Sequence, residues 1–216
     1  MIISHVMTKN PVFINPDMSI NDTRSLMIQE KIGHLPVLNK NNELVGLITK
    51  EDLAKARPSK ATSLDMYEIS YLLSKLQARD IMITDVVTVE ENEVVEEAAR
   101  IMADKSIGCL PVMRGKLLVG IITDTDLFRI FVKAFGARRR GIRITFSLIE
   151  QSGQLAKFAG AVAGMGGNIA SFVTSEGDDL SHSRVTCKVE GLSMAQVEEA
   201  AKQVLGAKVE DIREVR

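Results

Sequence analysis

The 216-residue chain contains no tryptophan, and aromatic residues make up only 4% of it. Its two cysteines, Cys109 and Cys187, lie far apart and form no Cys-x-x-Cys spacing. This excludes a disulfide-rich scaffold and predicts two buried, reduced thiols, as is typical of a cytoplasmic protein. Three histidines without metal-ligand spacing give no reason to expect a metal site.

Long apolar runs and an excess of charge of one sign are also missing. No apolar segment reaches about eighteen residues, and the N-terminus lacks the layout of a signal peptide. The formal net charge is −1 and the isoelectric point is about 6.3. Neither nucleic acid nor an anionic membrane is therefore expected as a partner, and a globular cytoplasmic protein is predicted.

No catalytic constellation is recognisable. The chain has no P-loop and no nucleophile elbow, and the glycine-rich segment 164–167 follows a predicted helix rather than a strand. The carboxylate pairs Glu90-Glu91 and Glu96-Glu97 are expected on the surface. We predict that the chain is not an enzyme and that it holds no catalytic cofactor and no metal.

What the sequence does contain is an internal duplication. The segment 44–53, LVGLITKEDL, recurs as LVGIITDTDL at 118–127, with seven of ten positions identical, and IGHLPV at 32–37 recurs as IGCLPV at 107–112. The downstream pair is offset by 74 residues (120 − 46) and the upstream pair by 75 (108 − 33). One residue is thus lost in the predicted hairpin turn 40–43, which is where a structural duplication should change length.

Each repeat is predicted to form strand, helix, strand, strand and helix. In the first repeat these are a strand at Val12–Ile14, a helix capped by Ser19, a hairpin of 35–38 and 44–48, and a helix from Lys50. In the second they are a strand at 86–89, a helix through 95–102, a hairpin around 114–116 and a helix from Asp124. Between the repeats, a capping box at 62–65 predicts a helix that packs the two together.

After the arginine-rich junction the pattern changes. Residues 142–148 alternate as a strand, 153–163 form a helix, 168–174 and 183–189 form strands, 193–205 form a helix, and 209–212 form an edge strand. The order βαββαβ predicts a ferredoxin-like α+β domain. The predicted divisions are 1–57 for the first repeat, 58–77 for the linker and packing helix, 78–136 for the second repeat, 137–141 for the junction and 142–216 for the last domain.

The repeated phrases, Leu-Pro-Val, a turn and then Gly-x-x-Thr-x-x-Asp, resemble the CBS domain, and the tandem resembles a Bateman module over about residues 1–136. The resemblance implies α/β repeats packed about a pseudo-twofold axis, with clefts for an adenine nucleotide or dinucleotide such as AMP, ADP, ATP or NAD. The positions it assigns to one cleft are Asn10, Pro11, Val12, His34 and Leu35. Those it assigns to the other are Asp85, Val86, Val87, Cys109 and Leu110.

The Thr-x-x-Asp ends of the two motifs carry the chemistry of such a cleft. Asp52 and Asp126 at helix N-termini would accept hydrogen bonds from both hydroxyls of a ribose, each worth about 1.5–3 kcal/mol. Thr49 and Thr123 lie where a helix dipole and free N–H groups favour phosphate. The alternative interpretation is that each Thr-x-x-Asp is a helix cap without a ligand. The run 138–140 of three arginines either reaches ligand phosphates or forms a solvated linker.

Residues 141–216 resemble an ACT domain. The family's turn after its first strand, Asp-x-Pro-Gly-x-Leu, is represented by 150–155, EQSGQL, and its Gly-x-Asn-Ile element by 166–169, GGNI. The resemblance implies amino-acid binding at Gly153, Gly167 and Asn168, where glycine permits close backbone approach and Asn168 would bind the ligand across a dimer interface. Glu replaces Asp and Ser replaces Pro in the first element, so the alternative is a domain that mainly forms dimers.

Together these features predict a non-enzymatic regulatory sensor. Its repeats would bind an adenosine-containing small molecule, its last domain would form a homodimer or bind a second ligand, and the signal would pass to an unidentified partner protein. The alternatives are a structural scaffold with empty clefts and an amino-acid sensor that acts through the last domain.

Overall fold

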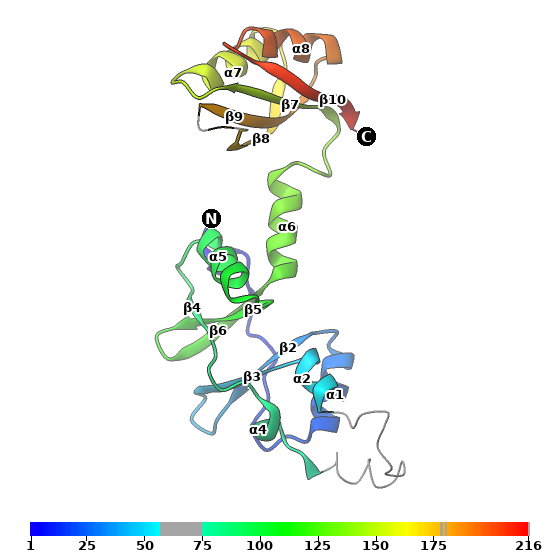
Figure 1. The fold of residues 1–216 in the computed structure, drawn as a ribbon. Helices are drawn as coiled ribbons and strands as arrows, with labels where there is room; N and C mark the ends of the chain where they lie inside the picture. Colours follow the sequence, from blue (N-terminus) through cyan, green and yellow to red (C-terminus); the bar gives the residue numbers. More distant parts are fainter. Residues whose placement is uncertain (57–74, 178, 180, 216) are drawn as a thin grey trace. The chain divides into compact units, whose positions relative to one another are not determined.

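The computed structural model describes residues 1–56, 75–177, 179 and 181–215. The chain divides into two compact units, Met1–Leu127 and Phe128–Arg216, which are described separately (Figure 1). The packing helix predicted between the repeats lies, as far as residue 74, outside the described residues. Among the described helices, none is long and apolar enough to cross a membrane.

The first unit contains both repeats as far as the start of α6, the last helix of the second repeat. The elements of the first repeat are η1 (Ile3–His5), β1 (Thr8–Lys9), α1 (Ile20–Gln29), β2 (His34–Leu38), β3 (Leu44–Thr49) and α2 (Lys50–Lys55). Those of the second are α4 (Ala78–Ile81), β4 (Val89–Glu90), α5 (Val95–Lys105), β5 (Cys109–Arg114), β6 (Leu117–Thr123) and α6 (Asp124–Ala134). Both predicted hairpins are present, and Ser19 caps α1 by accepting the N–H of Asp22.

The two hairpin turns explain the change in repeat offset. In the first turn, Asn39 accepts the N–H groups of Asn41 and Glu43 on its side-chain oxygen, and Asn42 has a φ of 58°. In the second turn, Gly115 supplies the left-handed conformation, with a φ of 59°. Asparagine and glycine are the residues that tolerate this region, so the deletion is absorbed without disturbing either hairpin.

The first strand of each repeat is shorter than predicted. At Val12–Ile14 only Ile14 pairs, through a parallel bridge to Val37, and in the second repeat only Val89–Glu90 pairs with β5. Asn10 adopts a φ of 48° and Pro11 lacks an N–H, so the chain cannot join the ladder immediately after β1. The residues on either side of the bridge are therefore left as extended loop.

The two repeats exchange their N-terminal segments. β1 pairs antiparallel with β6 of the second repeat, and Ile83 pairs with Leu47 of the first. The backbone N–H groups of Leu47 and Ile83 each donate to the other's carbonyl at 2.9 Å. The contact at Thr8 and Ile121 is its counterpart, since Thr8 and Ile83 lie 75 residues apart. Each half of the unit is thus completed by a segment that precedes the other repeat in sequence.

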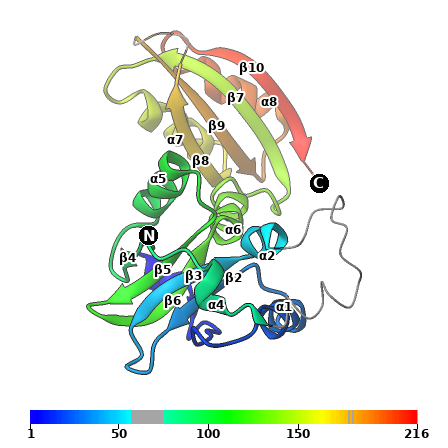
Figure 2. The same ribbon diagram turned by 60° about the horizontal axis from the view of Figure 1, so that its bottom comes forward.

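Glycine makes this exchange sterically possible. A Cβ at Gly46 would meet the Met82 side chain and lie 3.2 Å from the Ile83 carbonyl oxygen, and one at Gly120 would meet Met7 and lie 3.1 Å from the Thr8 carbonyl oxygen. The absence of a side chain at the glycine of each Gly-x-x-Thr-x-x-Asp motif therefore leaves room for the segment that crosses from the other repeat, the crossing segment. Figure 2 shows α1, α2 and α4 around the β2–β3 hairpin, where Ile20, Met27 and Leu35 form part of the core.

The second unit contains the six predicted elements in the predicted order. They are β7 (Gly141–Ile149), α7 (Gln154–Gly164), β8 (Asn168–Glu176), β9 (His182–Glu190), α8 (Met194–Lys202) and β10 (Lys208–Val215). The strands form an antiparallel sheet in the order β10-β7-β9-β8, with α7 and α8 on one face (Figure 1). Phe146 and Phe158 are fully buried between sheet and helices, and the opposite face carries the polar pair Thr145 and Thr186.

A clamp fastens the segment that follows α6 to this sheet. Lys188 is 3% exposed, and its ammonium donates to the carbonyls of Gly136, at 2.6 Å, and Arg139, at 2.9 Å. Arg139 forms two hydrogen bonds to the Glu190 carboxylate, at 2.8 and 2.9 Å, and Ser171 donates to the carbonyl of Phe135. The arginine run is thus held in part by the sheet rather than being simply a solvated linker.

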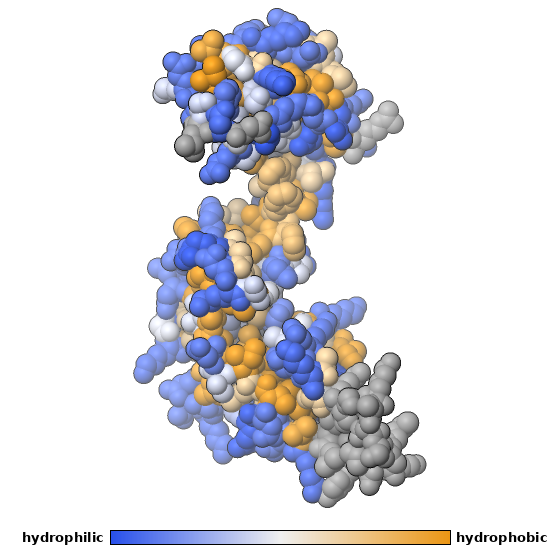
Figure 3. All heavy atoms as spheres, viewed as in Figure 1, coloured by the Kyte–Doolittle hydropathy of each residue, from blue (hydrophilic) through white to orange (hydrophobic). Residues whose placement is uncertain are grey.

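Helix α6, which precedes the clamp, carries exposed apolar side chains. Phe128 and Phe131 of α6 are 67% and 56% exposed, and Figure 3 shows apolar colouring along this helix. The boundary between the two compact units falls within α6.

Candidate functional site

A cavity of about 440 Å³ in the first unit collects residues from both repeats. The lining residues are Gly33, His34, Leu47, Thr49, Lys50, Glu51, Asp52, Lys55, Ile83, Asp85, Val86, Val87, Ser106, Ile107, Gly108 and Cys109. Seven of these belong to the predicted site, and they come from both predicted clefts. We refer to this cavity as the CBS-motif cleft.

The exchange of N-terminal segments explains why the two predicted sets are mixed. Asp85, Val86 and Val87 follow Ile83, which pairs with β3, so they lie beside Thr49 rather than beside Thr123. The corresponding residues Asn10, Pro11 and Val12 follow β1, which pairs with β6, and they do not line the CBS-motif cleft. The predicted grouping of Asn10–Val12 with His34 and of Asp85–Val87 apart from it was therefore wrong.

Leu35 and Leu110 also lie elsewhere than predicted. Both leucine side chains are fully buried in the core, because the Leu-Pro-Val strands alternate and direct the leucine inward. The residues just before them, His34 and Cys109, line the cleft instead. A Cβ built on Gly108 would lie 3.6 Å from His34 Nε2, so the imidazole rests against the second repeat.

The two Thr-x-x-Asp motifs close reciprocal helix caps. Asp52 Oδ2 accepts the Thr49 N–H at 2.8 Å and the Thr49 hydroxyl at 2.7 Å, while Thr49 Oγ1 accepts the Asp52 N–H at 3.3 Å. Thr123 and Asp126 make the same contacts, at 3.0, 2.8 and 3.4 Å, and Asp126 is buried. Both motifs therefore form the helix cap, and ribose binding by Asp52 and Asp126 stays a prediction. Among the described residues, Asp52 Oδ1 accepts no hydrogen bond.

Burial shifts the pKa values of two side chains that line the cleft, His34 and Cys109. Burial lowers the pKa of His34 below its usual value of 6.5, although the carboxylate of Asp124 acts in the opposite direction. His34 is therefore neutral near pH 7. Burial raises the pKa of the Cys109 thiol to about 12, so it is protonated and not a nucleophile. In the described part of the chain, no group of three or more His, Cys, Asp or Glu could hold a metal ion.

Ile83 and Ser106 are lining residues that the sequence interpretation missed. Ile83 is the counterpart of Thr8, and Ser106, with a φ of 53°, is the counterpart of Lys31, with a φ of 56°. Extending the 75-residue offset upstream to Val6-Met7 and Ile81-Met82 would have found the crossing segment. The pairing of that segment with the other repeat has no signal in one sequence.

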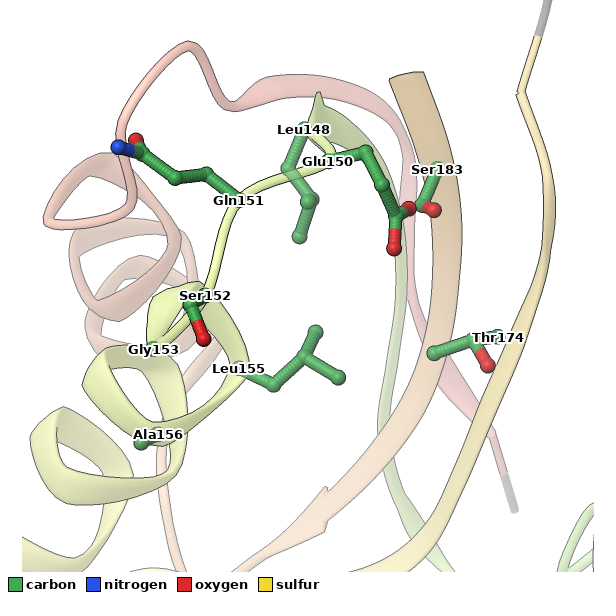
Figure 4. A pocket seen from close by; sticks show the side chains of 9 residues that line it. All are labelled: Leu148, Glu150, Gln151, Ser152, Gly153, Leu155, Ala156, Thr174 and Ser183. Atoms are coloured by element: carbon green, nitrogen blue, oxygen red, sulfur yellow. The ribbon is translucent and has the colours of Figure 1, made fainter. Parts of the chain in front are cut away.

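The second unit carries its own cavity, of about 550 Å³, at the turn between β7 and α7. Its lining residues are Leu148, Glu150, Gln151, Ser152, Gly153, Leu155, Ala156, Thr174 and Ser183. Figure 4 shows Leu148 and Leu155 turned into this cavity, with Thr174 facing them from β8. Gly153 is the N-cap of α7, with a φ of 86°, and as a glycine it makes no side-chain cap hydrogen bond there.

The other two residues predicted for this site lie apart from Gly153. Asn168 begins β8 opposite Glu190, whereas Thr174 lies six residues further along the same strand, about 20 Å away. Gly167 packs against Leu192, where a Cβ would lie 2.7 Å from the leucine side chain. Within one chain the predicted set of Gly153, Gly167 and Asn168 does not form one site.

Solved structures resemble the first part of this chain. An acetoin utilization protein (AcuB) from Vibrio cholerae, described as putative, is 30% identical, with a TM-score of 0.53, over 64% of this chain and 95% of that one. The CBS domain pair of protein MJ0100, in complex with 5′-methylthioadenosine and S-adenosyl-L-methionine, is 28% identical, with a TM-score of 0.52, over 64% and 98%. CBSX2 in complex with AMP is 27% identical, with a TM-score of 0.50, over 64% and 98%.

The curated relatives are much longer proteins. The homoserine O-acetyltransferase of Methanosarcina acetivorans is 31% identical over 62% of this chain, but the match spans only 22% of the relative. The chain thus matches about a quarter of the length of such relatives. Within this chain, the CBS domain family model matches residues 3–59 and 78–133, which are the two repeats. The chain therefore belongs to the CBS domain family and contains a tandem pair of these domains.

Proposed function

We propose that the CBS-motif cleft binds an adenosine-containing ligand and that the protein is a non-enzymatic regulatory sensor. The observation that carries the proposal is a cavity of about 440 Å³ lined by both repeats, with Asp52 at its edge. Its volume lies in the range of small-molecule sites, about 300–1,000 Å³. The similar CBS pairs that hold AMP, S-adenosylmethionine and 5′-methylthioadenosine support the same ligand chemistry.

The lining residues divide into polar and apolar groups that suit a nucleoside. Asp52 Oδ1 is an acceptor for a ribose hydroxyl, and it needs no opening of the helix cap. Val86, Val87 and Ile107 offer apolar surface for a purine ring. We assign the ligand to His34, Asp52, Asp85–Val87 and Cys109 of the predicted site, with Thr49 as the residue that positions Asp52.

Regulation requires a ligand that favours one arrangement of the protein over another, because equal binding to both shifts nothing. We propose that the ligand changes the packing of the two repeats and that a partner protein in the cytoplasm senses this change. The six elements of the second unit and their sheet order support an ACT-like, ferredoxin-like domain that forms a homodimer. The divisions 1–57, 78–136 and 142–216 remain our proposed domains. The similarity to AcuB supports a regulator but leaves acetoin itself a suggestion.

Calorimetric titration of the purified protein with AMP, ATP, NAD and S-adenosylmethionine tests this proposal. We expect saturable binding of at least one of them, weakened by Asp52→Asn, which keeps the shape of the cap residue. The matched control is Asp104→Asn, which makes the same change at an exposed residue outside the cleft. Absence of binding to every adenosine-containing compound would instead favour a structural scaffold with empty clefts.

A thermal-shift assay provides an independent check. A ligand at about 100 times its dissociation constant should stabilise the protein by about 2.7 kcal/mol, a shift of several degrees, whereas a scaffold should not respond. The assay uses the unmodified chain, so a negative calorimetric result caused by a small binding enthalpy would be recognised.

The cavity at the β7–α7 turn favours a second candidate, an amino-acid sensor. Its cavity combines the Glu150 carboxylate with the hydroxyls of Ser152, Thr174 and Ser183 around Leu155, which is 40% exposed (Figure 4). This candidate predicts a thermal shift with an amino acid that survives Asp52→Asn and is lost with Glu150→Gln. A response lost with Asp52→Asn would contradict it.

A further inference from the structure

The charged side chains of the CBS-motif cleft do not suit a phosphate. The described lining residues include two lysines and three carboxylates, which gives a net charge of −1 when His34 is neutral. Lys55 is paired with Glu51 at 3.0 Å. This leaves Lys50 in the same cavity as the carboxylates of Asp52 and Asp85, and no arginine is present among the described lining residues.

The helix cap occupies part of the backbone that a phosphate would use. The helix that begins at the cleft, α2, has only six residues, so its dipole is short. The Asp52 N–H at its start is bonded to Thr49 Oγ1, and the hydroxyl of Thr49 is bonded to Asp52 Oδ2. A phosphate would have to break this reciprocal cap before it could use either group.

The size of the cleft keeps these charges within reach of any ligand. A volume of 440 Å³ corresponds to a sphere about 9 Å across, which is similar to the Debye length of about 8 Å at physiological ionic strength. A bound ligand therefore interacts with Asp52 and Asp85 wherever its 5′ substituent lies. Asp85 is exposed and has no hydrogen-bond or ion-pair partner among the described residues, so its carboxylate is available to a ligand.

From these charges we infer that the cleft selects adenine nucleosides whose 5′ substituent is uncharged or positively charged, such as a thioether or a sulfonium, over nucleotides with phosphate chains. The inference rests on the proposed function, because it presumes that an adenosine-containing ligand binds here. It narrows the ligand class: each added phosphate brings negative charge toward the carboxylates of Asp52 and Asp85, which Lys50 offsets only in part, whereas a sulfonium is attracted by these carboxylates.

Titrations of the full chain with adenosine, 5′-methylthioadenosine, S-adenosylmethionine, AMP and ATP, without divalent cations, test the inference. We expect the uncharged and cationic compounds to bind at least about tenfold more tightly than AMP, and ATP to bind more weakly still. Raising the sodium chloride concentration should weaken the binding of S-adenosylmethionine and leave the affinity for 5′-methylthioadenosine unchanged. Tighter binding of AMP or ATP would overturn the selectivity but retain the sensor. Binding of none of the five would overturn the proposed function itself.

Charge variants separate an electrostatic role from a structural one. Relative to 5′-methylthioadenosine, Asp85→Asn should strengthen the binding of AMP about fivefold and weaken the binding of S-adenosylmethionine by a similar factor. The matched control is Glu96→Gln, which removes one carboxylate at an exposed position outside the cleft. Equal effects of Asp85→Asn on all three ligands, or no effect on the two charged ones, would contradict the inference.

Discussion

Replacing Lys188 by methionine should release the segment that joins α6 to the second unit. The Lys188 ammonium holds two carbonyls, those of Gly136 and Arg139, and the side chain is 3% exposed. Methionine keeps most of the volume but leaves both carbonyls without their donor. Each unsatisfied buried group costs about 1–3 kcal/mol, and removing the desolvated ammonium recovers part of this, so we expect local destabilisation of about 2 kcal/mol.

Limited proteolysis with trypsin measures this opening at the clamp itself. Cleavage after Arg139 attacks the carbonyl that Lys188 holds, and the Arg139 guanidinium is engaged by Glu190. If the bond is cut only when the clamp opens, 2 kcal/mol corresponds to about thirtyfold faster cleavage in Lys188→Met. Fragment masses distinguish this bond from the one after Arg138.

The control for this experiment is Lys157→Met, which changes an exposed lysine on α7 of the same unit. It should leave the cleavage rate after Arg139 unchanged. If Lys188→Met is cut no faster than the parent protein, the two carbonyls are satisfied by water when the ammonium is absent, and the clamp does not fasten the segment.

Three further changes test the first unit. Gly120→Ala should lower the free energy of unfolding by about 1–3 kcal/mol, because a Cβ there lies 3.0 Å from Met7 Cγ and 3.1 Å from the Thr8 carbonyl oxygen. In a double-mutant cycle of melting temperatures, Met7→Ala should recover part of this loss, and purely additive losses would contradict the contact. Thr49→Val should lower the free energy of unfolding, measured by chemical denaturation, by about 1 kcal/mol, because it opens the cap on α2. Thr88→Val on an exposed loop should lower it little, and equal losses would argue against the cap. Because the pKa of His34 is lowered in the folded protein, the unfolded chain binds a proton on His34 more readily than the folded protein does. The stability due to neutral His34 is therefore present above the unfolded pKa of 6.5 and declines as the pH falls toward the folded pKa. Melting temperatures between pH 5 and 7 should show this decline in the parent protein and less of it in His34→Gln.

Local patterns predicted the elements well, because each had a physical signature within a few residues. Ser19 predicted the start of α1 as a cap, the turns at 40–43 and 114–116 predicted the hairpins, and alternation in 142–148 predicted β7. The Thr-x-x-Asp motif was ambiguous at this level. The observed geometry shows the cap on Asp52 Oδ2 and leaves Oδ1 for a ligand, so the two roles are compatible.

The arrangement of the site could not be predicted in the same way, because it depends on pairing between distant segments. Ile83 pairs with Leu47, and Thr8 pairs with Ile121, across 113 residues. Repeat periodicity is equally compatible with each segment joining its own repeat. The choice between these arrangements decides whether Asp85 lies beside Asp52 or Asp126, and therefore which charges form the cleft.

The exchange of segments is what would let a ligand in the cleft act on both repeats in the proposed function. Its walls are the β3–α2 motif of the first repeat, the segment Asp85–Val87 that crosses onto that repeat, and Gly108–Cys109 of the second repeat. A ligand that touches all three walls adds its binding free energy to the packing of the two repeats, so it stabilises whichever packing closes these walls around it. If each repeat kept its own N-terminal segment, a ligand could bind to one repeat alone and would have little influence on the other. The glycines at 46 and 120, which admit the crossing segments, are therefore as necessary to the proposed sensing as the residues that contact the ligand.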